Sequence, residues 1–376
     1  MDDGQAIPLR RLPLHDLHVG QGGRMVPFAG WEMPVHYPAG VMAEHLHTRS
    51  AASLFDVSHM GQVLLRPRNG LDHLASCVEA LVPADILGLP RGRQRYALLT
   101  DDAGGIRDDV MMANRGDHLF VVVNASTRDA DLAHFRESLG HAEVEEAADR
   151  ALLALQGPTA EHALGRLVPA VSGMRFMDVA IVPWGGMDLW LSRSGYTGED
   201  GFEISVPATG AQTLAEALLA GGEVKLAGLG ARDSLRLEAG LCLYGNDIDR
   251  TTSPVEAGLS WSIGKARRIG GSRAGGFPGA DRILRQLELG PRRQRVGLQP
   301  EGRAPMRAGT AITSPEGHVG HVTSGGFGPT LQAPIAMGYV DAKLAQPGTR
   351  LNGDVRGRSL PVSVVPLPFV APSFKR

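Results

Sequence analysis

Two adjacent acids, Asp108 and Asp109, lie in a segment that follows two glycines and alternates like a β-strand. Neighbouring strand residues point to opposite faces, so Asp108 is expected on the apolar face formed by Ile106, Val110 and Met112. Burying a charge on such a face is costly. Asp108 therefore acts as a general base or stabiliser of positive charge, or it accepts a backbone hydrogen bond from a turn.

The same alternation places Asp109 on the face of Arg107, a ready ion-pair partner. Asp109 thus has an ordinary structural explanation, because a neighbouring cation offsets its charge. We expect Asp108, and not Asp109, to face a binding pocket.

Another carboxylate lies on a predicted hairpin whose strands cover residues 187–191 and 202–206. The apolar residues of the second strand share the core face, which turns Glu203 toward solvent or a pocket. A carboxylate accepts two parallel hydrogen bonds from an amino–imino edge such as that of a pterin or guanine. Spacing alone also allows a solvated strand face.

The third motif, Gly-Leu-Gly-Ala-Arg-Asp over residues 228–233, leads into a predicted helix. Asp233 occupies the place of the third glycine, so the motif is not a dinucleotide-binding fingerprint. Arg232 lies in the first turn, where the helix dipole is already positive. An anionic ligand or a structural salt bridge would relieve this repulsion.

Other chemistries are not supported by the residue spacing. On a helix, His45 and His47 point about 200° apart, and Ser58 and His59 project from opposite faces of a strand, so we expect no metal site. None of the four lysines has the setting of a phosphate loop or of a pyridoxal phosphate site. The net charge of −2 and arginine clusters without interleaved aromatics argue against binding to nucleic acid.

The surrounding pattern predicts a strand-rich α+β protein, because 49 glycines and 25 prolines mark many turns. Beyond Pro291, short strands alternate with turns, which predicts an all-β domain. The other expected elements are a hairpin over 106–123 with its turn at 114–116, a helix from Ser126 to Gly140, a helix with Pro158 in its first turn, and a helix from near Ala231 to Gly240.

The sequence also bears on the cellular location of the protein and on whether it forms disulfides. The segment from Met1 to Arg11 has no apolar run of signal-peptide length, and no stretch has the roughly 20 apolar residues of a membrane span. With only Cys77 and Cys242, no disulfide framework is expected. We therefore expect a cytoplasmic protein that does not bind a membrane.

Several motifs occur together from residue 12 onward, in one order. They are Phe28–Pro34 (FAGWEMP), Phe55–Gly61 (FDVSHMG), the GGxxDD hairpin, Gly195–Glu199 (GYTGE), Gly228–Gly240 and Val322–Gly325 (VTSG). In this combination the chain resembles the aminomethyltransferase, or T-protein, family of the glycine cleavage system.

The resemblance implies an α+β, three-domain cloverleaf around a central folate cavity. The implied first domain is discontinuous, binds folate and covers 1–55 and 140–245. The second, α+β, domain covers 56–139 and 246–288 and carries Asp108. The third, 289–376, is all-β and resembles a barrel.

The resemblance also implies the reaction. The lipoyl arm of the H-protein presents an aminomethyl group, tetrahydrofolate takes the one-carbon unit to give 5,10-methylenetetrahydrofolate, and ammonia and dihydrolipoyl H-protein are released. Tetrahydrofolate is then the co-substrate and the lipoylated H-protein the partner. The family's reaction needs neither a metal nor pyridoxal phosphate.

Site residues follow from the same resemblance. The family's essential aspartate matches Asp108, its pterin-binding glutamate matches Glu203, and its folate-contacting arginine matches Arg232. Tyr96 and Tyr196 match further pocket positions. One position departs: where family members often carry a folate-contacting tyrosine near the C-terminus, this chain has Phe374, which can stack but has no hydroxyl.

Two other functions share the folate site. They are a folate-dependent demethylase or methyltransferase of the same superfamily, and a non-catalytic folate-binding accessory protein. The full Gly228–Gly240 motif and the 376-residue length without a fused flavoprotein domain favour the aminomethyltransferase. Asp108 argues against a protein that only binds folate, because binding alone has less use for a buried acid.

Overall fold

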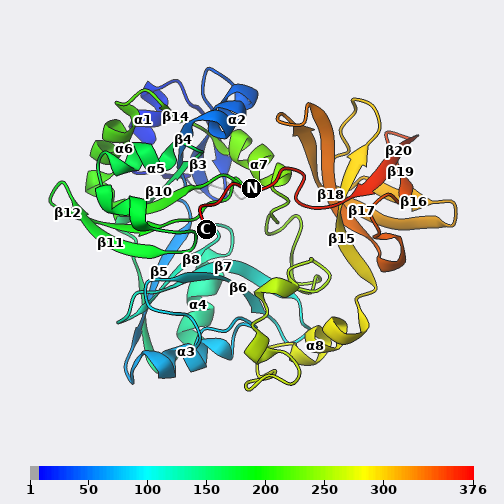
Figure 1. Ribbon diagram of the computed structural model, residues 1–376, viewed down its shortest axis with the longest axis horizontal. Coiled ribbons are helices and arrows are strands. Elements are labelled where there is room, and N and C mark those ends of the chain that lie inside the picture. The colour runs from blue at the N-terminus through cyan, green and yellow to red at the C-terminus, as the bar shows by residue number, and fades with distance from the viewer. Residues whose placement is uncertain (1–7) are drawn as a thin grey trace, which may run out of the picture.

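The computed structural model describes residues 8–376 and has three lobes arranged around a common centre (Figure 1). Met1 to Ile7, which entered the expectation about targeting, lie outside the described residues. Across residues 8–376, no helix is long and apolar enough to cross a membrane.

The first lobe contains a mixed sheet, and helices pack on one of its faces to form an apolar core. Alternate residues of one strand, Phe202, Ile204 and Val206, enter this core and leave Glu203 on the other face, as their spacing predicts. The sheet has the order β11 (Val179–Trp184), β12 (Met187–Ser192), β13 (Gly201–Pro207), β10 (Arg150–Gln156), β4 (Ala52–Asp56), β14 (Val224–Leu226).

Within residues 8–376, five helices belong to the first lobe. One of them confirms the helix predicted from near residue 231, and a short one begins two residues after Pro158. The five helices are α1 (His15–Gly20), α2 (Val41–Ser50), α5 (Ala160–Gly165), α6 (Ala211–Leu219) and α7 (Leu229–Glu238), with the 3-10 turns η1 (Pro169–Gly173) and η2 (Ala208–Gly210). A small sheet of β1 (Arg10–Arg11), β3 (Trp31–His36) and β2 (Arg24–Phe28) completes the lobe.

The second lobe is a five-stranded sheet covered on one face by two helices. Leu74 and Val78 of one helix and Leu132 and Phe135 of the other are buried against Val121 of the sheet. The sheet order is β6 (Gln94–Thr100), β7 (Ile106–Asn114), β8 (Leu119–Val123), β5 (Gly61–Pro67), β9 (Ala142–Glu146), and the two covering helices are α3 (Leu71–Glu79) and α4 (Arg128–Ser138). A further helix, α8 (Ala280–Leu289), packs in a separate cluster with Phe277.

These elements confirm the predicted hairpin and the helix that follows it. One predicted boundary is wrong in detail. Residues from 140 onward were assigned to the first domain, but β9 pairs with β5, so the second lobe keeps this strand.

Residues 240–279 then lead from α7 to α8 through η3 (Ser260–Ser262) and η4 (Lys265–Arg267).

A bulge interrupts the pairing of β6 with β7. Thr100 lies opposite Ile106, whereas the preceding residue, Leu99, lies opposite Asp108. Two steps along β7 thus correspond to one step along β6, which makes Arg107 the extra residue. Strict alternation of faces ends at this point.

The two acids point to opposite faces of the sheet, and the bulge moves Ile106 to the face of Asp109. Asp108 lies opposite Leu99, whose side chain packs in the core beneath α3 and α4. Asp109 lies opposite Leu98, which packs in a different cluster together with Ile106. The predicted grouping of Ile106 with Asp108 on one face is therefore wrong, and Asp109 is the acid that faces away from the helices.

The third lobe is a closed six-stranded barrel, which confirms the predicted all-β domain. Its order is β15 (Arg293–Pro300), β18 (Ala333–Asp341), β17 (Gly317–Gly328), β16 (Ala311–Ser314), β19 (Arg350–Val355), β20 (Arg358–Val365), with β20 pairing back to β15, and η5 (Ala342–Leu344) follows β18. The chain then leaves the barrel and returns to the first lobe, where Val370 N–H donates to the carbonyl oxygen of Glu238 at 2.9 Å (Figure 1).

Candidate active site

Five of the predicted or adjacent site residues converge between the first two lobes. We call them the central polar cluster: Tyr96 on β6, Asp109 on β7, Tyr196 in the turn before β13, Glu203 on β13, and Arg232 on α7. Each keeps part of its surface accessible to solvent. Desolvation nevertheless dominates the pKa shifts of four of them, so these side chains line a recess rather than an open surface.

The second lobe contributes a hydrogen-bonded carboxylate. Tyr96 donates its hydroxyl to Asp109 Oδ2 at 3.0 Å, and the Asn124 amide donates to Asp109 Oδ1 at 2.8 Å. Burial raises the pKa of Asp109 to about 7, and the neighbouring Asp108 adds to the shift. A carboxyl with that pKa exchanges its proton near neutral pH, as a general acid or base must.

The first lobe contributes a cation beside an aromatic ring. The Arg232 guanidinium lies 4.8 Å from the centre of the Tyr196 ring, and the Tyr196 hydroxyl donates to the carbonyl oxygen of Cys242. Glu203 accepts a hydrogen bond from the Ser194 hydroxyl at 2.6 Å. Burial lowers the pKa of Arg232, and the nearby charge of Glu203 opposes that shift.

Arg232 has no ion-pair partner among residues 8–376, and its Nη1 is buried without a hydrogen-bond partner there. A structural salt bridge therefore does not account for this cation. A buried donor without an acceptor is costly, which fits an acceptor atom supplied by a ligand.

Cys242 joins the two halves of the cluster, because Tyr96 packs in one apolar cluster with it and the Tyr196 hydroxyl donates to its carbonyl oxygen. Burial raises the pKa of Tyr196, and the negative charge of Asp109 raises it further. The pKa of Tyr96 is raised by burial, by Asp109 and also by Tyr196. The recess thus places the Asp109 carboxylate of one lobe within electrostatic reach of Tyr196 of the other.

Asp108 lies elsewhere, and its predicted position on the pocket side is wrong. Its side chain is completely buried and accepts hydrogen bonds from the Asn124 N–H at 3.1 Å and the Asn124 amide at 2.8 Å. Burial raises the pKa of Asp108, and the adjacent carboxyl of Asp131 raises it further. Within the described chain, Asp109 forms no ion pair with Arg107, whose Nε is buried without a partner.

Sequence reasoning missed Asn124, which joins the two acids. Its amide donates at 2.8 Å to both Asp108 Oδ1 and Asp109 Oδ1. A polar residue placed directly between an apolar strand and the helix start at Ser126 is the signal that was available. Trp261 was also missed: its ring centre lies 5.2 Å from that of Tyr96, and 62% of the residue is exposed.

Phe374 does not join the central polar cluster. It stacks on Phe176, with ring centres 4.1 Å apart and planes 5° from parallel. The tail is fixed there by the Phe176 N–H, which donates to the carbonyl oxygen of Lys375 at 2.8 Å. The predicted folate contact of Phe374 is therefore not supported by its position.

The two histidines considered for metal binding lie in separate environments. His45 contacts Glu238 and Ser234, whereas His47 bonds to the carbonyl oxygen of Glu223. Over residues 8–376, no three His, Cys, Asp or Glu side chains are grouped so that they could hold a metal ion.

Two protein families match most of the chain. The GCVT N-terminal domain matches residues 14–267, and the glycine cleavage T-protein C-terminal barrel domain matches residues 293–371. The second match coincides with the six-stranded barrel and the start of the tail.

Curated proteins and a solved structure agree with these matches. The mitochondrial aminomethyltransferase of Mus musculus is 48% identical, with 97% of this chain and 91% of the relative covered. That of Flaveria pringlei is 46% identical, with 96% and 90% covered. The crystal structure of the glycine cleavage system aminomethyltransferase from Bartonella henselae is 42% identical, with a TM-score of 0.91 and 98% of this chain and 100% of that chain covered.

One expectation is overturned by these relatives. The chain was expected to be cytoplasmic, but the similar proteins of Mus musculus, Flaveria pringlei and Homo sapiens are named mitochondrial. The lack of a signal-peptide pattern near Met1 was therefore not a sound basis for the assignment, because other targeting routes use other signals.

The fold, the recess and the two matched families agree over nearly the whole described chain. Neither the demethylase nor the folate-binding accessory protein is favoured by the matches. The chain belongs to the aminomethyltransferase, or T-protein, family of the glycine cleavage system.

Proposed function

We propose that this chain transfers a one-carbon unit from the aminomethyl-loaded lipoyl arm of the H-protein to tetrahydrofolate, with release of ammonia. The observation that carries the proposal is the central polar cluster. There, the Asp109 carboxylate, with a pKa near neutrality, is held by Tyr96 and Asn124 and lies near Tyr196, whose ring carries the Arg232 guanidinium.

The residues of the recess fit a reduced pterin. Glu203 offers a carboxylate for an amino–imino edge, and Arg232 offers a buried donor that lacks a protein acceptor. The rings of Tyr96 and Tyr196 provide flat apolar surface beside these polar groups. This donor and acceptor set supports tetrahydrofolate as co-substrate.

We assign the chemical role to Asp109, in place of the predicted Asp108. When bound, tetrahydrofolate supplies the amine nitrogen that takes up the one-carbon unit. The Asp109 carboxylate lies where it can stabilise positive charge that develops on nitrogen, and its pKa of about 7 lets it hold or release a proton. Tyr96 and Asn124 fix the orientation of both carboxylate oxygens.

Asp108 supports the Asp109 carboxylate from the opposite face of the sheet, through Asn124. Burial and the adjacent Asp131 raise the pKa of Asp108, which disfavours a second full negative charge beside Asp109. Through the shared Asn124 amide it helps to set the position of the catalytic carboxylate. We propose Asp108 as a positioning residue.

The test is ammonia release from aminomethyl-loaded H-protein, measured with and without tetrahydrofolate. We expect formation of 5,10-methylenetetrahydrofolate in step with ammonia and no comparable release without folate. A chain that demethylates a small methylated amine, but leaves loaded H-protein unchanged, would contradict the proposal. Binding of folate without turnover would favour the accessory protein.

A further inference from the structure

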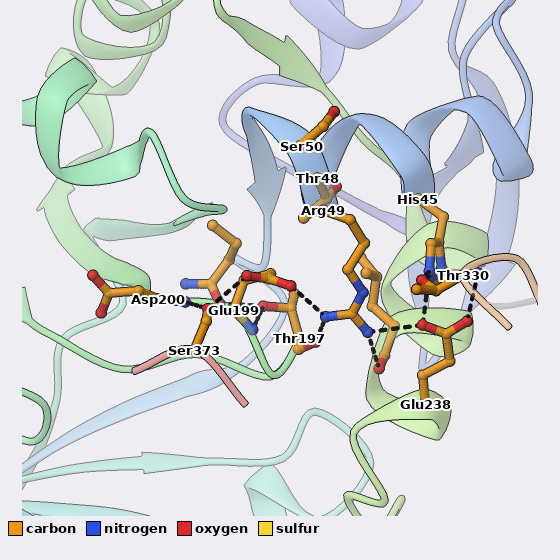
Figure 2. Close-up of polar contacts among 12 residues, drawn as sticks. His45, Thr48, Arg49, Ser50, Thr197, Glu199, Asp200, Glu238, Thr330 and Ser373 are labelled. Carbon is orange, nitrogen blue, oxygen red and sulfur yellow. Dashed lines mark hydrogen bonds and ion pairs between the residues drawn. The ribbon is translucent and has the colours of Figure 1, made fainter. Parts of the chain in front are cut away.

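A buried arginine outside the recess joins the two first-lobe segments that carry the folate-contacting residues. Arg49, near the end of α2, donates from Nη1 to the Thr197 carbonyl oxygen and to Glu199 Oε1, both at 2.8 Å (Figure 2). From Nη2 it donates to Glu238 Oε2 at 3.0 Å and to the carbonyl oxygen of Leu235 at 3.4 Å. One guanidinium thus binds both a turn and a helix.

The turn that Arg49 holds carries Tyr196, and the helix carries Arg232. These two residues face each other across 4.8 Å, so their spacing depends on how the turn lies against the helix. The contact is close. At Gly198, with φ of +79°, a Cβ would lie 2.9 Å from the Cβ of Ala239 at the end of α7.

The two carboxylates bonded to Arg49, those of Glu199 and Glu238, also accept hydrogen bonds from other parts of the chain. Glu238 Oε1 accepts the N–H of Thr330, from a barrel loop, at 2.8 Å, and His45 lies 3.0 Å from Glu238 Oε2. Glu199 Oε2 accepts the hydroxyl of Ser373, from the C-terminal tail, at 2.6 Å. Figure 2 shows these contacts as one continuous row of side chains.

The charges in this row are buried and paired. The side chain of Glu238 is completely buried, and although burial opposes ionisation, hydrogen bonds from His45 and Thr330 hold its pKa at about 2. Arg49 therefore lies between the carboxylates of Glu199 and Glu238, with 9% of its side chain exposed. Such a pair fixes geometry more than it adds stability, because desolvation offsets much of the attraction.

We propose that Arg49 is a positioning residue for tetrahydrofolate, which sets the distance between the turn carrying Tyr196 and the helix carrying Arg232. The barrel and the tail take part through Thr330 and Ser373, although neither residue belongs to the central polar cluster. This inference rests on the proposed folate site. It adds that folate affinity depends on a contact row outside that site.

The decisive variant is Arg49→Lys. Lysine keeps the positive charge but lacks the planar guanidinium whose two amino groups bond to both segments. We expect the dissociation constant for tetrahydrofolate, measured by calorimetry, to rise at least about tenfold, while turnover at saturating folate stays within about twofold. The split follows because Arg49 positions Tyr196 and Arg232 but contacts neither Asp109 nor Tyr96.

Arg267→Lys is the matched control. Arg267 is also buried and pairs with Glu79, but it lies against the second lobe. We expect a comparable fall in melting temperature with unchanged folate affinity. Equal losses of folate affinity in both variants would overturn the positioning role, because general destabilisation would then explain them.

Ser373→Ala is the milder second variant, for the case that Arg49→Lys does not fold. It removes one hydrogen bond to Glu199, and we expect folate affinity to fall by about twofold to fivefold. Unchanged affinity in Ser373→Ala, or in a folded Arg49→Lys protein, would overturn the inference alone. Failure of the unmodified chain to bind tetrahydrofolate would instead overturn the proposed function.

Discussion

Replacing each acid of the Asp108–Asp109 pair separately tests the assignment of the catalytic carboxylate. Asp109→Asn removes the negative charge that faces the recess. It also leaves one acceptor oxygen for two donors, Tyr96 and Asn124, which both bond to the native carboxylate. Asp108→Asn changes a side chain that is completely buried on the face beneath α3 and α4 and does not face the recess.

The expected size follows from Coulomb's law. Two unit charges about 4 Å apart interact by about 4 kcal/mol at an effective dielectric constant of about 20. Since about 1.4 kcal/mol corresponds to a tenfold change in rate, Asp109→Asn should slow the transfer by about a thousandfold. For Asp108→Asn we expect a loss of at most about tenfold.

Single-turnover measurements with aminomethyl-loaded H-protein at saturating tetrahydrofolate separate the two variants. Calorimetry should give folate dissociation constants within a few-fold of the unmodified chain for both, since neither acid is assigned to binding. If Asp108→Asn carries the larger rate loss, the assignment of Asp109 as the catalytic carboxylate is refuted. If Asp109→Asn loses affinity and rate together, its role is binding and not chemistry.

Five further outcomes are expected. Glu203→Gln should weaken tetrahydrofolate binding by about 1–3 kcal/mol, because a charge-assisted hydrogen bond is lost; an unchanged dissociation constant would remove Glu203 from the site. Turnover should rise with pH and level off above about pH 7, and a profile flat between about pH 6 and 8 would contradict the role of Asp109. Because the folded-state pKa of Asp109 is raised above its ordinary value of 3.8, ionisation destabilises the fold as the pH rises from there to about 7, so Asp109→Asn should raise the melting temperature at pH 8 and not at pH 4. Phe374→Tyr should leave folate affinity unchanged, because the ring stacks on Phe176, and a gain of about 0.5–1.5 kcal/mol would place it in the site after all. Turnover should also survive dialysis against EDTA, and a loss restored by zinc would reveal a metal requirement.

Alternation along a regular strand predicted the environment of Glu203 correctly. β13 pairs without interruption with β10, so Phe202, Ile204 and Val206 all enter the core and Glu203 stays on the opposite face. The turn and helix signals around Ser126 depend on neighbouring residues, and they located the hairpin and α4 for the same reason.

The same rule placed Asp108 correctly beside Val110 and Met112, which lie in the core beneath α3 and α4, and it failed for Ile106, which the bulge turns to the other face. Which face of the sheet meets the recess depends on how the lobes pack, and one strand does not contain that information. Nothing within residues 104–112 marks Arg107 as an extra residue; only its pairing with β6 does. The contact of Arg49 with Glu238 joins residues 189 positions apart, and local spacing contains no trace of it. The family resemblance supplied Tyr96 and Tyr196, but it matched the essential aspartate to Asp108, whereas Asp109 is the acid that faces the recess.

The position of β4 in the first-lobe sheet has a consequence for the order of folding during synthesis. β4 ends at Asp56, but its two neighbours, β10 and β14, begin only at Arg150 and Val224. The sheet of the second lobe, by contrast, is complete at Glu146, so this lobe can form on the ribosome while the first lobe waits. Until Leu226 has been made, an apolar strand remains with an open edge, and chaperone capture during this interval would protect the nascent chain from aggregation.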